Sequence, residues 1–305
     1  MSSPVFISGL DRSGKTYMRF MLESHPSFAF SKRTNLWPRF YKRFGDLNKD
    51  DNLDRCLEAL ASHKHVQALE PDFQRIRWDL EAGPRTYERL FALIHEQYAA
   101  RLRKSRWGDQ TELLEKYANR ILAAYPDAKF IHMLRDPRDR YEAVISKSKR
   151  RGGVGAATAR WLYSAALAEK NQKAYPQRYK VVRYEEMVTF PEETMYRVCE
   201  FLGEKYYPPM VKMGDVPRFA NAATVNAGDA PGPLTTAYVG RFEDNLPTRE
   251  IVFIQKLSRR YMRLFDYPIE RIRFSLSERA RFYSFHLLIN SIRMFGWRMR
   301  NMAAR

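Results

Sequence analysis

The sequence predicts an α/β fold in which a P-loop-like central parallel sheet is flanked by helices and followed by a basic C-terminal helical tail. Three features support this prediction. A short apolar run near the N-terminus ends in a glycine-bounded loop that leads into a helical pattern. Short apolar runs then alternate with helical patterns over about two hundred residues, which is typical of a parallel sheet. The final segment, residues 271–305, combines arginines with aromatic side chains.

Each element follows from a local pattern. Residues 4–9 are apolar and end in a glycine, and Met18, Met21 and Leu22 then recur at helical spacing. We expect strands at residues 4–9, 129–134 and 179–183. We expect helices at residues 15–23, 51–103 with a break near Gly83-Pro84, 112–125, 137–145, 156–174, 191–202 and 248–265. We expect irregular segments at 147–155 and 208–233, which are rich in glycine, proline or basic residues. Residues 1–270 are expected to form one domain and residues 271–305 an extension of it.

The composition is that of a globular protein with excess positive charge. The 305 residues carry 53 Lys and Arg against 35 Asp and Glu, which gives a net charge of +18 and implies an acidic partner or surface. Apolar residues make up 45%, enough for a full core. The only cysteines, Cys56 and Cys199, lie in apolar stretches, so we expect a reducing compartment and no metal site built on them.

The sequence carries no pattern of a secretion signal or a membrane span. A strand pattern begins at residue 4, which leaves no room for a charged and then apolar signal region. No apolar stretch approaches the ~20 residues that a spanning helix needs. We therefore expect a cytoplasmic protein that is soluble or attached peripherally to the inner membrane surface.

The glycine-bounded loop predicts a phosphate site. Gly9-Leu-Asp-Arg-Ser-Gly14-Lys15-Thr16 has the spacing G-x-x-x-x-G-K-[ST] between a predicted strand and a predicted helix. Loop N–H groups and the positive end of a helix dipole attract an anion there, and Arg12 and Lys15 add charge. The motif alone fits an ATP or GTP enzyme. Such chemistry also needs a Mg²⁺ carboxylate at a second strand end, but the chain offers Arg135 first at that place.

Three segments in the same order resemble the sulfotransferase family, whose members use 3′-phosphoadenosine 5′-phosphosulfate (PAPS) as sulfuryl donor. They are Arg12-Ser-Gly-Lys-Thr16, Arg135-Asp-Pro-Arg-Asp139 and Arg183-Tyr-Glu-Glu-Met187, the last leading to Phe201-Leu-Gly203. Together with the weaker Tyr238-Val-Gly-Arg-Phe242 and with His25-Pro26 they cover roughly residues 4–267. The N-terminal third is most similar to the tyrosylprotein and bacterial branch of the family.

The resemblance implies a role for particular residues and requires no metal. The expected donor-binding residues are Arg12, Ser13, Gly14, Lys15 and Thr16 at the 5′-phosphosulfate, Arg135 at the 3′-phosphate, and Tyr17 and Tyr184 at the adenine. Arg12 and Lys15 would also stabilise the charge that develops on the leaving phosphate. The acceptor would be a hydroxyl of a carbohydrate, a lipid-linked compound or another small molecule, held by segments 28–45, 65–80 and 208–235.

The chain departs from the family pattern at several positions. Where the family has a serine eight residues after its first 3′-phosphate arginine, this chain has Ala143, and Ser146 one turn later is the candidate substitute. Where cytosolic members have Arg-Lys-Gly, this chain has Thr235-Thr236-Ala237, for which Arg241 and the Lys149-Arg150-Arg151 loop can compensate.

The catalytic base is the largest departure. In the stretch Ser31-Lys-Arg-Thr-Asn35, both positions where the tyrosylprotein branch could place its glutamate, Lys32 and Arg33, are cationic. Gln110 lies in the segment where that branch has a lysine. Asp109 is our candidate base, with Glu70 second. These departures leave three alternatives open: a sulfotransferase, a P-loop kinase or NTPase, and a degenerate relative that binds nucleotide without turnover.

The C-terminal tail holds much of the positive charge. Residues 271–305 contain eight arginines and one glutamate, interleaved with Phe274, Phe282, Phe285, Phe295 and Trp297. A basic amphipathic helix suits an anionic membrane surface. The alternative is a helix that packs its aromatic side chains on the core and leaves its arginines in water. We do not expect nucleic acid as a partner, because the charge is dispersed and no recognisable binding module is present.

Overall fold

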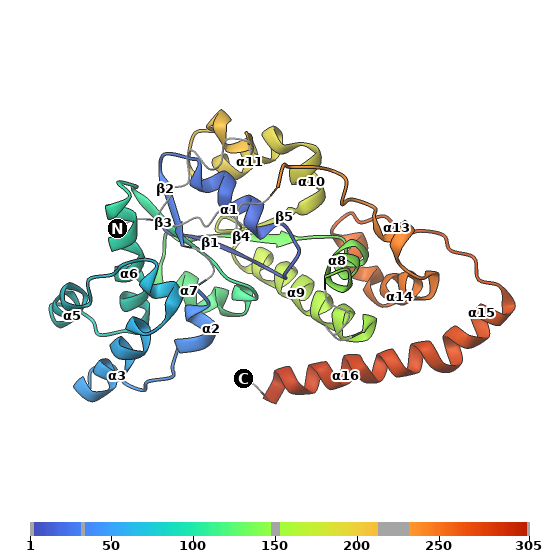
Figure 1. Cartoon of the computed structure of the whole chain (residues 1–305), viewed down its shortest axis with the longest axis horizontal. Coiled ribbons are helices and arrows are strands. Elements are labelled where there is room, and N and C mark those ends of the chain that lie inside the picture. The colour runs from blue at the N-terminus through green and yellow to red at the C-terminus, as the bar shows by residue number, and fades with distance from the viewer. Residues whose placement is uncertain (1–2, 32–33, 148–152, 213–231, 304–305) are drawn as a thin grey trace.

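A five-stranded parallel sheet forms the centre of the protein (Figure 1). The computed structural model describes residues 3–31, 34–147, 153–212 and 232–303. The strands run in the order β2-β3-β1-β4-β5, and every neighbouring pair is parallel. Their bounds are β1 Val5–Gly9, β2 Phe28–Ser31, β3 Arg106–Gln110, β4 Lys129–Leu134 and β5 Tyr179–Arg183. The predicted α/β class is therefore confirmed.

Helices cover both faces of this sheet and continue into the C-terminal tail (Figure 1). The helices before β4 are α1 Lys15–Glu23, α2 Leu36–Phe40, α3 Asp50–Ala61, α4 Lys64–Gln67, α5 Phe73–Glu81, α6 Tyr87–Arg101, the 3₁₀ turn η1 Leu114–Tyr117 and α7 Ala118–Ala124. The later helices are α8 Pro137–Ile145, α9 Val154–Ala174, α10 Tyr184–Thr189, α11 Pro191–Leu202, η2 Pro208–Val211, α13 Phe242–Asn245, α14 Thr248–Leu264, α15 Leu276–Arg281, the π-type turn η4 Phe282–His286 and α16 Leu287–Ala303.

Alternation along β1 divides the core into two layers. Phe6 belongs to the cluster formed with α3, α5, α6 and α7, whereas Val5 and Ile7 pack with α1 and α11 on the opposite face. This is the period-two pattern of a strand buried on both sides. The helical tail is not remote from the rest, since α16 lies along α9. The proposed boundary at residue 270 stays a prediction.

The sequence did not reveal two of the five strands. Residues 28–31 were expected within an irregular acceptor segment, and β3 reads Arg-Trp-Gly-Asp-Gln, which has no apolar run. Both segments form strands because parallel pairing to a buried neighbour satisfies their backbone groups. The expected helical region 51–103 contains four helices, and one interruption comes at Glu70, which has a left-handed φ of 46° before Pro71.

The strand order reverses between β1 and β4. After β1 the chain forms β2 and β3 on one side, and β4 and β5 then add on the other side. Ligands of open α/β sheets bind at such a reversal, beyond the carboxyl ends of the strands. Gly9 pairs with Met133 in the register of these strands, so the loop after β1 and Arg135 after β4 leave the sheet side by side.

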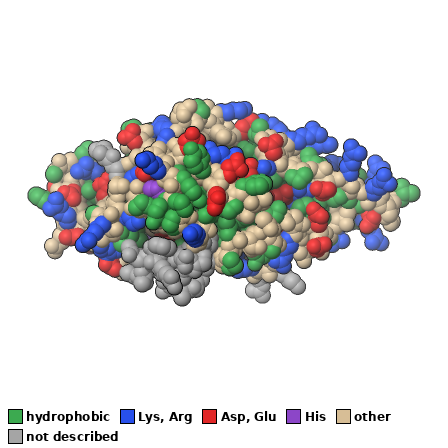
Figure 2. Space-filling model, turned by 90° about the horizontal axis from the view of Figure 1, so that it is seen from above, with side chains coloured by type: hydrophobic (Ala, Val, Ile, Leu, Met, Phe, Trp, Pro, Cys, Tyr) green, Lys and Arg blue, Asp and Glu red, His purple; other side chains and the backbone are tan. Residues whose placement is uncertain are grey.

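On the face shown in Figure 2, positive charge is distributed rather than gathered into one stripe. Lys and Arg side chains occur toward both ends of that face and are mixed with Asp and Glu (Figure 2). Hydrophobic side chains gather nearer the middle of the same face.

Candidate active site

The loop after β1 has the backbone shape of an anion cradle. Gly9 and Gly14 have φ of 114° and 85°, and Arg12 between them has φ of 63°. A Cβ on Gly9 would lie 2.2 Å from the Met133 carbonyl oxygen, so β1 and β4 can approach here only with glycine. Helix α1 begins at Lys15 with no side-chain cap and no acidic residue in its first turn. Its first N–H groups are therefore not taken up by a capping side chain and can face an anion.

Lys15 and Arg12 differ in exposure. The Lys15 ammonium donates to the carbonyls of Gly9 at 2.9 Å and Leu10 at 2.5 Å, and the side chain is buried. Arg12 is exposed at the turn. The loop thus holds one cation within its own backbone and presents another to solvent. Ser13 is buried, and Thr16 is partly buried on the first turn of α1.

Arg135 connects the two segments that were predicted to grip one ligand. Its Nη1 donates to the Arg12 carbonyl at 3.0 Å, and its Nη2 donates to the Tyr238 carbonyl at 2.7 Å. The guanidinium lies 4.4 Å from the centre of the Tyr184 ring. Its Nε is buried without a hydrogen-bond partner among the described residues. A buried donor left over in this way suits an anionic ligand.

Three tyrosines, Tyr184, Tyr17 and Tyr238, lie near Arg135. Gly14 closes onto Tyr184, because a Cβ at Gly14 would lie 2.6 Å from the Tyr184 ring. Burial raises the pKa of Tyr184 to about 12, although Arg135 acts in the opposite direction. Burial and the nearby Tyr238 raise the pKa of Tyr17, again against Arg135. Tyr17 and Tyr184 were predicted for this place, whereas Tyr238 was noted only within a weaker motif.

The rest of the Arg135–Arg140 run holds the site together. Arg138 is buried, bonds Asp136 at 2.7 Å and donates to the Pro268 carbonyl at 2.8 Å, which ties α8 to the chain after α14. Asp139 accepts from the N–H groups of Gly240 at 2.8 Å and Phe242 at 3.0 Å. It thereby fixes the segment that carries Tyr238. The sequence signal for this support was the alternation of charges within six residues.

A second support lies beneath the loop. Arg140 pairs with Asp11, and the Glu115 carboxylate accepts from the Gly9 N–H at 3.2 Å and from the Ser164 hydroxyl at 2.6 Å. Burial lowers the pKa of His132, which bonds the Tyr179 hydroxyl at 2.7 Å. The imidazole therefore belongs to the interior, as its place on a buried strand indicated. Glu115 was not predicted, because nothing in its local sequence marks a buried carboxylate.

Asp109 lies in an enclosed polar cluster at the end of β3. Its Oδ1 accepts from the hydroxyls of Ser31 at 3.0 Å and Thr34 at 2.7 Å, and the residue is 1% exposed. Oδ2 is buried with no partner within the described part of the chain. His95 is 3.9 Å from Oδ1, and burial lowers its pKa despite this carboxylate.

The second candidate base and Gln110 lie elsewhere. Glu70 is exposed and pairs with Arg101. Gln110 accepts from Arg19 Nε at 3.1 Å, on the α1 side of the sheet. Arg33 lies outside the described residues.

Of the residues predicted to replace the missing 3′-phosphate contacts, Ser146 is exposed and Arg241 lies near Tyr238. Ser146 is exposed at the end of α8, one turn beyond the partly buried Ala143. Arg241 is 3.5 Å from the carboxylate of Glu142, and its guanidinium lies 5.7 Å from the Tyr238 ring. Arg241 is therefore close to the tyrosine cluster. The Lys149-Arg150-Arg151 loop lies outside the described residues.

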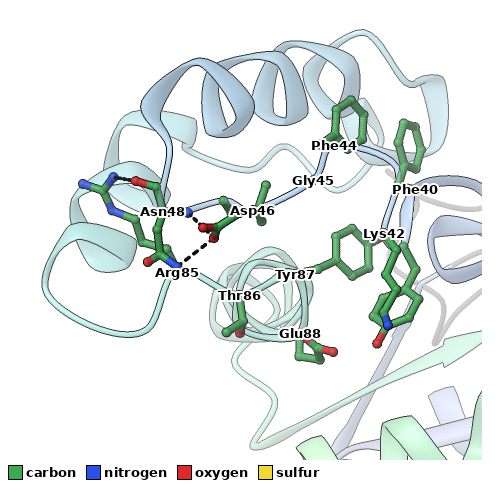
Figure 3. Close-up of a pocket in the computed structure, with 12 residues that line it drawn as sticks. Phe40, Lys42, Phe44, Gly45, Asp46, Asn48, Arg85, Thr86, Tyr87 and Glu88 are labelled. Atoms are coloured by element: carbon green, nitrogen blue, oxygen red, sulfur yellow. Dashed lines mark hydrogen bonds between the residues drawn. The ribbon is translucent and has the colours of Figure 1, made fainter.

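A pocket opens between the chain after α2 and the start of α6 (Figure 3). Its volume is about 240 Å³, and Phe40, Phe44 and Tyr87 line it together with Lys42 and Arg85. Figure 3 shows the Tyr87 ring beside Lys42, with the two phenylalanines on the same side of both. Part of the predicted acceptor segment 28–45 therefore forms a pocket wall. Within the residues that the structure describes, no group of three or more His, Cys, Asp and Glu side chains could hold a metal ion.

The fold and this arrangement define an α/β protein with a P-loop-type loop after β1 and a buried arginine, Arg135, next to it. A model of the sulfotransferase family matches residues 4–208. The chain belongs to the sulfotransferase family, as its three motifs indicated. It is also similar to the protein-tyrosine sulfotransferase of Drosophila melanogaster, with 26% identity over 204 residues, and to protein-tyrosine sulfotransferase 2 of Gallus gallus, with 24% identity over 220 residues.

These relatives are longer proteins. Each match covers 65% of this chain, but only 37% of the Drosophila protein and 50% of the Gallus protein, so the chain spans about half their length or less. Two solved structures share the fold: the sulfotransferase domain from the curacin biosynthetic pathway (TM-score 0.61, 15% identity) and that of the Synechococcus PCC 7002 olefin synthase (TM-score 0.60, 18% identity). Each comparison covers 88% of this chain, and 99% and 96% of the respective domains.

Proposed function

We propose that this protein transfers a sulfuryl group from PAPS to a hydroxyl group of an acceptor. The observation that carries the proposal is the position of Arg135, whose guanidinium bonds the Arg12 carbonyl at 3.0 Å and stacks on Tyr184. One ligand that carries phosphate groups at two positions of a ribose and an aromatic base on the same ribose suits this arrangement. Arg12, Ser13, Gly14, Lys15 and Thr16 would bind its 5′-phosphosulfate, and Arg135, with Ser146 and Arg241 as further candidates, its 3′-phosphate.

The transfer would be an in-line displacement at sulfur. The acceptor oxygen forms a bond to sulfur while the bond between sulfur and the bridging oxygen of the 5′-phosphate breaks, and 3′-phosphoadenosine 5′-phosphate leaves. Negative charge grows on that bridging oxygen, where Arg12, Lys15 and the N-terminus of α1 would stabilise it, by analogy with phosphoryl transfer. Asp109 is the proposed base for the acceptor proton.

Two finer points belong to the same proposal. The similarity to protein-tyrosine sulfotransferases adds the tyrosine hydroxyl to the carbohydrate, lipid-linked and small-molecule hydroxyls that we propose as acceptors. We also propose a reducing, cytoplasmic setting, which the two buried free cysteines support. No helix in the described ranges is long and apolar enough to cross a membrane.

Calorimetric titration tests the donor site. The unaltered protein should bind 3′-phosphoadenosine 5′-phosphate more tightly than adenosine 5′-phosphate, which lacks only the 3′-phosphate. Arg135→Ala should remove most of this preference, about tenfold or more, because a hydrogen bond to a charged group contributes ~1.5–3 kcal/mol. No binding at millimolar concentration, with binding of ATP and Mg²⁺ instead, would favour the P-loop kinase or NTPase that the loop motif alone allows. Family membership favours the sulfotransferase.

A second candidate function is binding of the nucleotide without turnover. The observation behind it is Asp109, which is 1% exposed in this structure. Transfer of radiolabelled sulfate from PAPS to a panel of tyrosine peptides, carbohydrates and lipid-linked hydroxyls separates the two functions. Product that forms with the unaltered protein and is lost in Arg12→Ala excludes the inert binder. Binding of the nucleotide with no product on any acceptor would support the inert binder.

A further inference from the structure

Helix α16 and the preceding turn η4 present an apolar ridge to the outside of the molecule. Phe285, Leu288, Ile292, Phe295 and Met299 are between 45% and 69% exposed. Their spacing of three and four residues places all five on one side of a continuous helical segment. At 1.5 Å per residue the ridge is about 21 Å long. Single exposed apolar residues are ordinary, but a contiguous strip of this kind marks an interaction surface.

The opposite side of the same helix is attached to the protein. Asn290 and Phe282 are buried, and the Trp297 ring lies 5.9 Å from the Tyr163 ring of α9. The Asn290 carbonyl would lie 2.2 Å from a Cβ placed on Gly155 of α9, so the two helices are in close contact. In Figure 1, α16 runs along the lower edge of the molecule with no other element drawn beyond it. The tail therefore packs one side on the protein and leaves an apolar side exposed, so neither of the two arrangements considered from the sequence describes it fully.

Arginines flank the apolar ridge on both sides. Arg298 and Arg300 are exposed, and each lies about 100° around the helix from Met299, in opposite directions. Arg293 is also exposed, but its Nη1 donates to the Asn290 side chain at 3.3 Å, on the side of the helix that faces α9. No acidic residue occurs in residues 279–305. A second copy of this face would bring arginines against arginines, so the charge favours an anionic occupant over self-association.

We propose that this ridge binds the surface of an anionic lipid bilayer, with α16 lying in the plane of the interface. The apolar side chains would enter the boundary between head groups and acyl chains, and the flanking arginines would contact lipid phosphates and carboxylates. The helix stays parallel to the surface because its other side is fixed to α9. This inference is independent of the proposed sulfuryl transfer.

Flotation of the full chain with lipid vesicles tests the proposal. We expect binding to vesicles of phosphatidylcholine with phosphatidylserine, and much weaker binding to phosphatidylcholine alone or at high salt, which screens surface charge. Ile292→Ser/Phe295→Ser should weaken partitioning by about tenfold or more, because both lost side chains contribute apolar area. The control Trp78→Ser/Tyr196→Ser removes two side chains that are each 60% exposed elsewhere and should bind normally.

A charge pair completes the test. Arg298→Glu/Arg300→Glu should weaken binding to the anionic vesicles by about tenfold or more, whereas Lys64→Glu/Arg103→Glu, at exposed sites in or near α4 and α6, makes the same change in net charge and should have little effect. Thermal unfolding of each variant confirms that it folds.

Three results would overturn the proposal. One is equal binding to neutral and anionic vesicles. Another is unchanged vesicle binding by Ile292→Ser/Phe295→Ser. That result would show that the tail attracts polyanions in general, nucleic acid included, without using the ridge. The third is a protein that does not bind vesicles but sediments as a dimer, with Ile292→Ser/Phe295→Ser sedimenting as a monomer. That result would assign the ridge to a second copy.

Discussion

Arg135 joins three chain segments through one side chain. Its guanidinium bonds the loop after β1 and the segment before α13, and it stacks on the first residue of α10. A lysine at this position would keep the charge but lose the planar stacking and the paired donors. Two other single residues are also open to direct tests: Gly14, which allows the loop to approach Tyr184, and Asp109, the proposed base.

Gly14 is required for both its backbone conformation and its contact with Tyr184. We expect Gly14→Ala to weaken binding of 3′-phosphoadenosine 5′-phosphate by about tenfold or more and to destabilise the protein by ~1–3 kcal/mol, because the new Cβ would lie 2.6 Å from the ring at a φ of 85°. Gly203→Ala is the matched control, since Gly203 has a φ of 74° and nothing within 4 Å of its Cβ position. Calorimetry and thermal unfolding measure both effects. Equal losses in the two variants would mean that backbone strain alone is responsible.

Asp109 can be tested by a substitution that keeps its shape. We expect Asp109→Asn to lower the rate of sulfuryl transfer by ~10²–10⁴-fold, because the general base is removed, with unchanged affinity for 3′-phosphoadenosine 5′-phosphate. Thr34→Val is the control, since it removes the 2.7 Å hydrogen bond and keeps the carboxylate. A similar loss of rate in both variants would assign Asp109 to support of the loop after β2.

At the scale of elements, the junction of β5 and α10 contains a carboxylate, Glu185, whose charged form is disfavoured by burial and by a neighbouring carboxylate. Burial, and then the neighbouring Asp136, raise the pKa of Glu185 to about 7. Its Oε1 accepts from the Asp136 N–H at 2.8 Å, and its Oε2 is buried with no partner in the described structure. The junction that presents Tyr184 to the site is therefore sensitive to protonation.

This junction should make stability depend on pH. The pKa of Glu185 in the folded protein lies above its usual value. Between about pH 4.5 and 7 the folded state therefore holds a proton that the unfolded state has released. The free energy of unfolding consequently falls as pH rises through that range. We expect Glu185→Gln to remove this decrease and to be more stable than the unaltered protein at pH 8 by a few kcal/mol at most. Denaturant unfolding of both proteins at pH 5 and pH 8 measures the difference. Parallel pH curves for the two proteins would contradict it.

The missed strands show what element prediction lacked. Strands β1, β4 and β5 have apolar runs, and the sequence located them within a residue or two. Strand β3 contains Arg106, Gly108 and Asp109, each buried by a tertiary contact that local sequence does not show. Gly108 is needed because a Cβ there would lie 2.2 Å from the Phe30 ring of β2. The need for glycine at position 108 depends on the neighbouring strand and cannot be read from the local sequence.

At the scale of the whole molecule, the attachment of α16 to α9 joins residues far apart in the sequence. We expect Gly155→Ala to destabilise the protein by ~1–3 kcal/mol, because its Cβ would lie 2.2 Å from the Asn290 carbonyl oxygen and the helices would have to separate. Gly296→Ala, within α16 and with nothing near its Cβ position, should be neutral or stabilising. Thermal unfolding compares the two variants. An unchanged midpoint in Gly155→Ala would mean that the tail does not contribute to the stability of the fold.

The sequence by itself determined the α/β class and the family, and it located the glycine-bounded loop and Arg135 at the ends of two strands that prove to be neighbours, because these depend on local spacing and on the order of strands and helices. The binding roles of Arg12, Lys15 and Arg135 stay predictions. Only the tertiary structure decided that Asp109 is enclosed, that Asp139 holds the segment carrying Tyr238, and which side of α16 faces outward. Burial and hydrogen bonding between distant segments arise when the sheet assembles, so a single stretch of chain does not contain them.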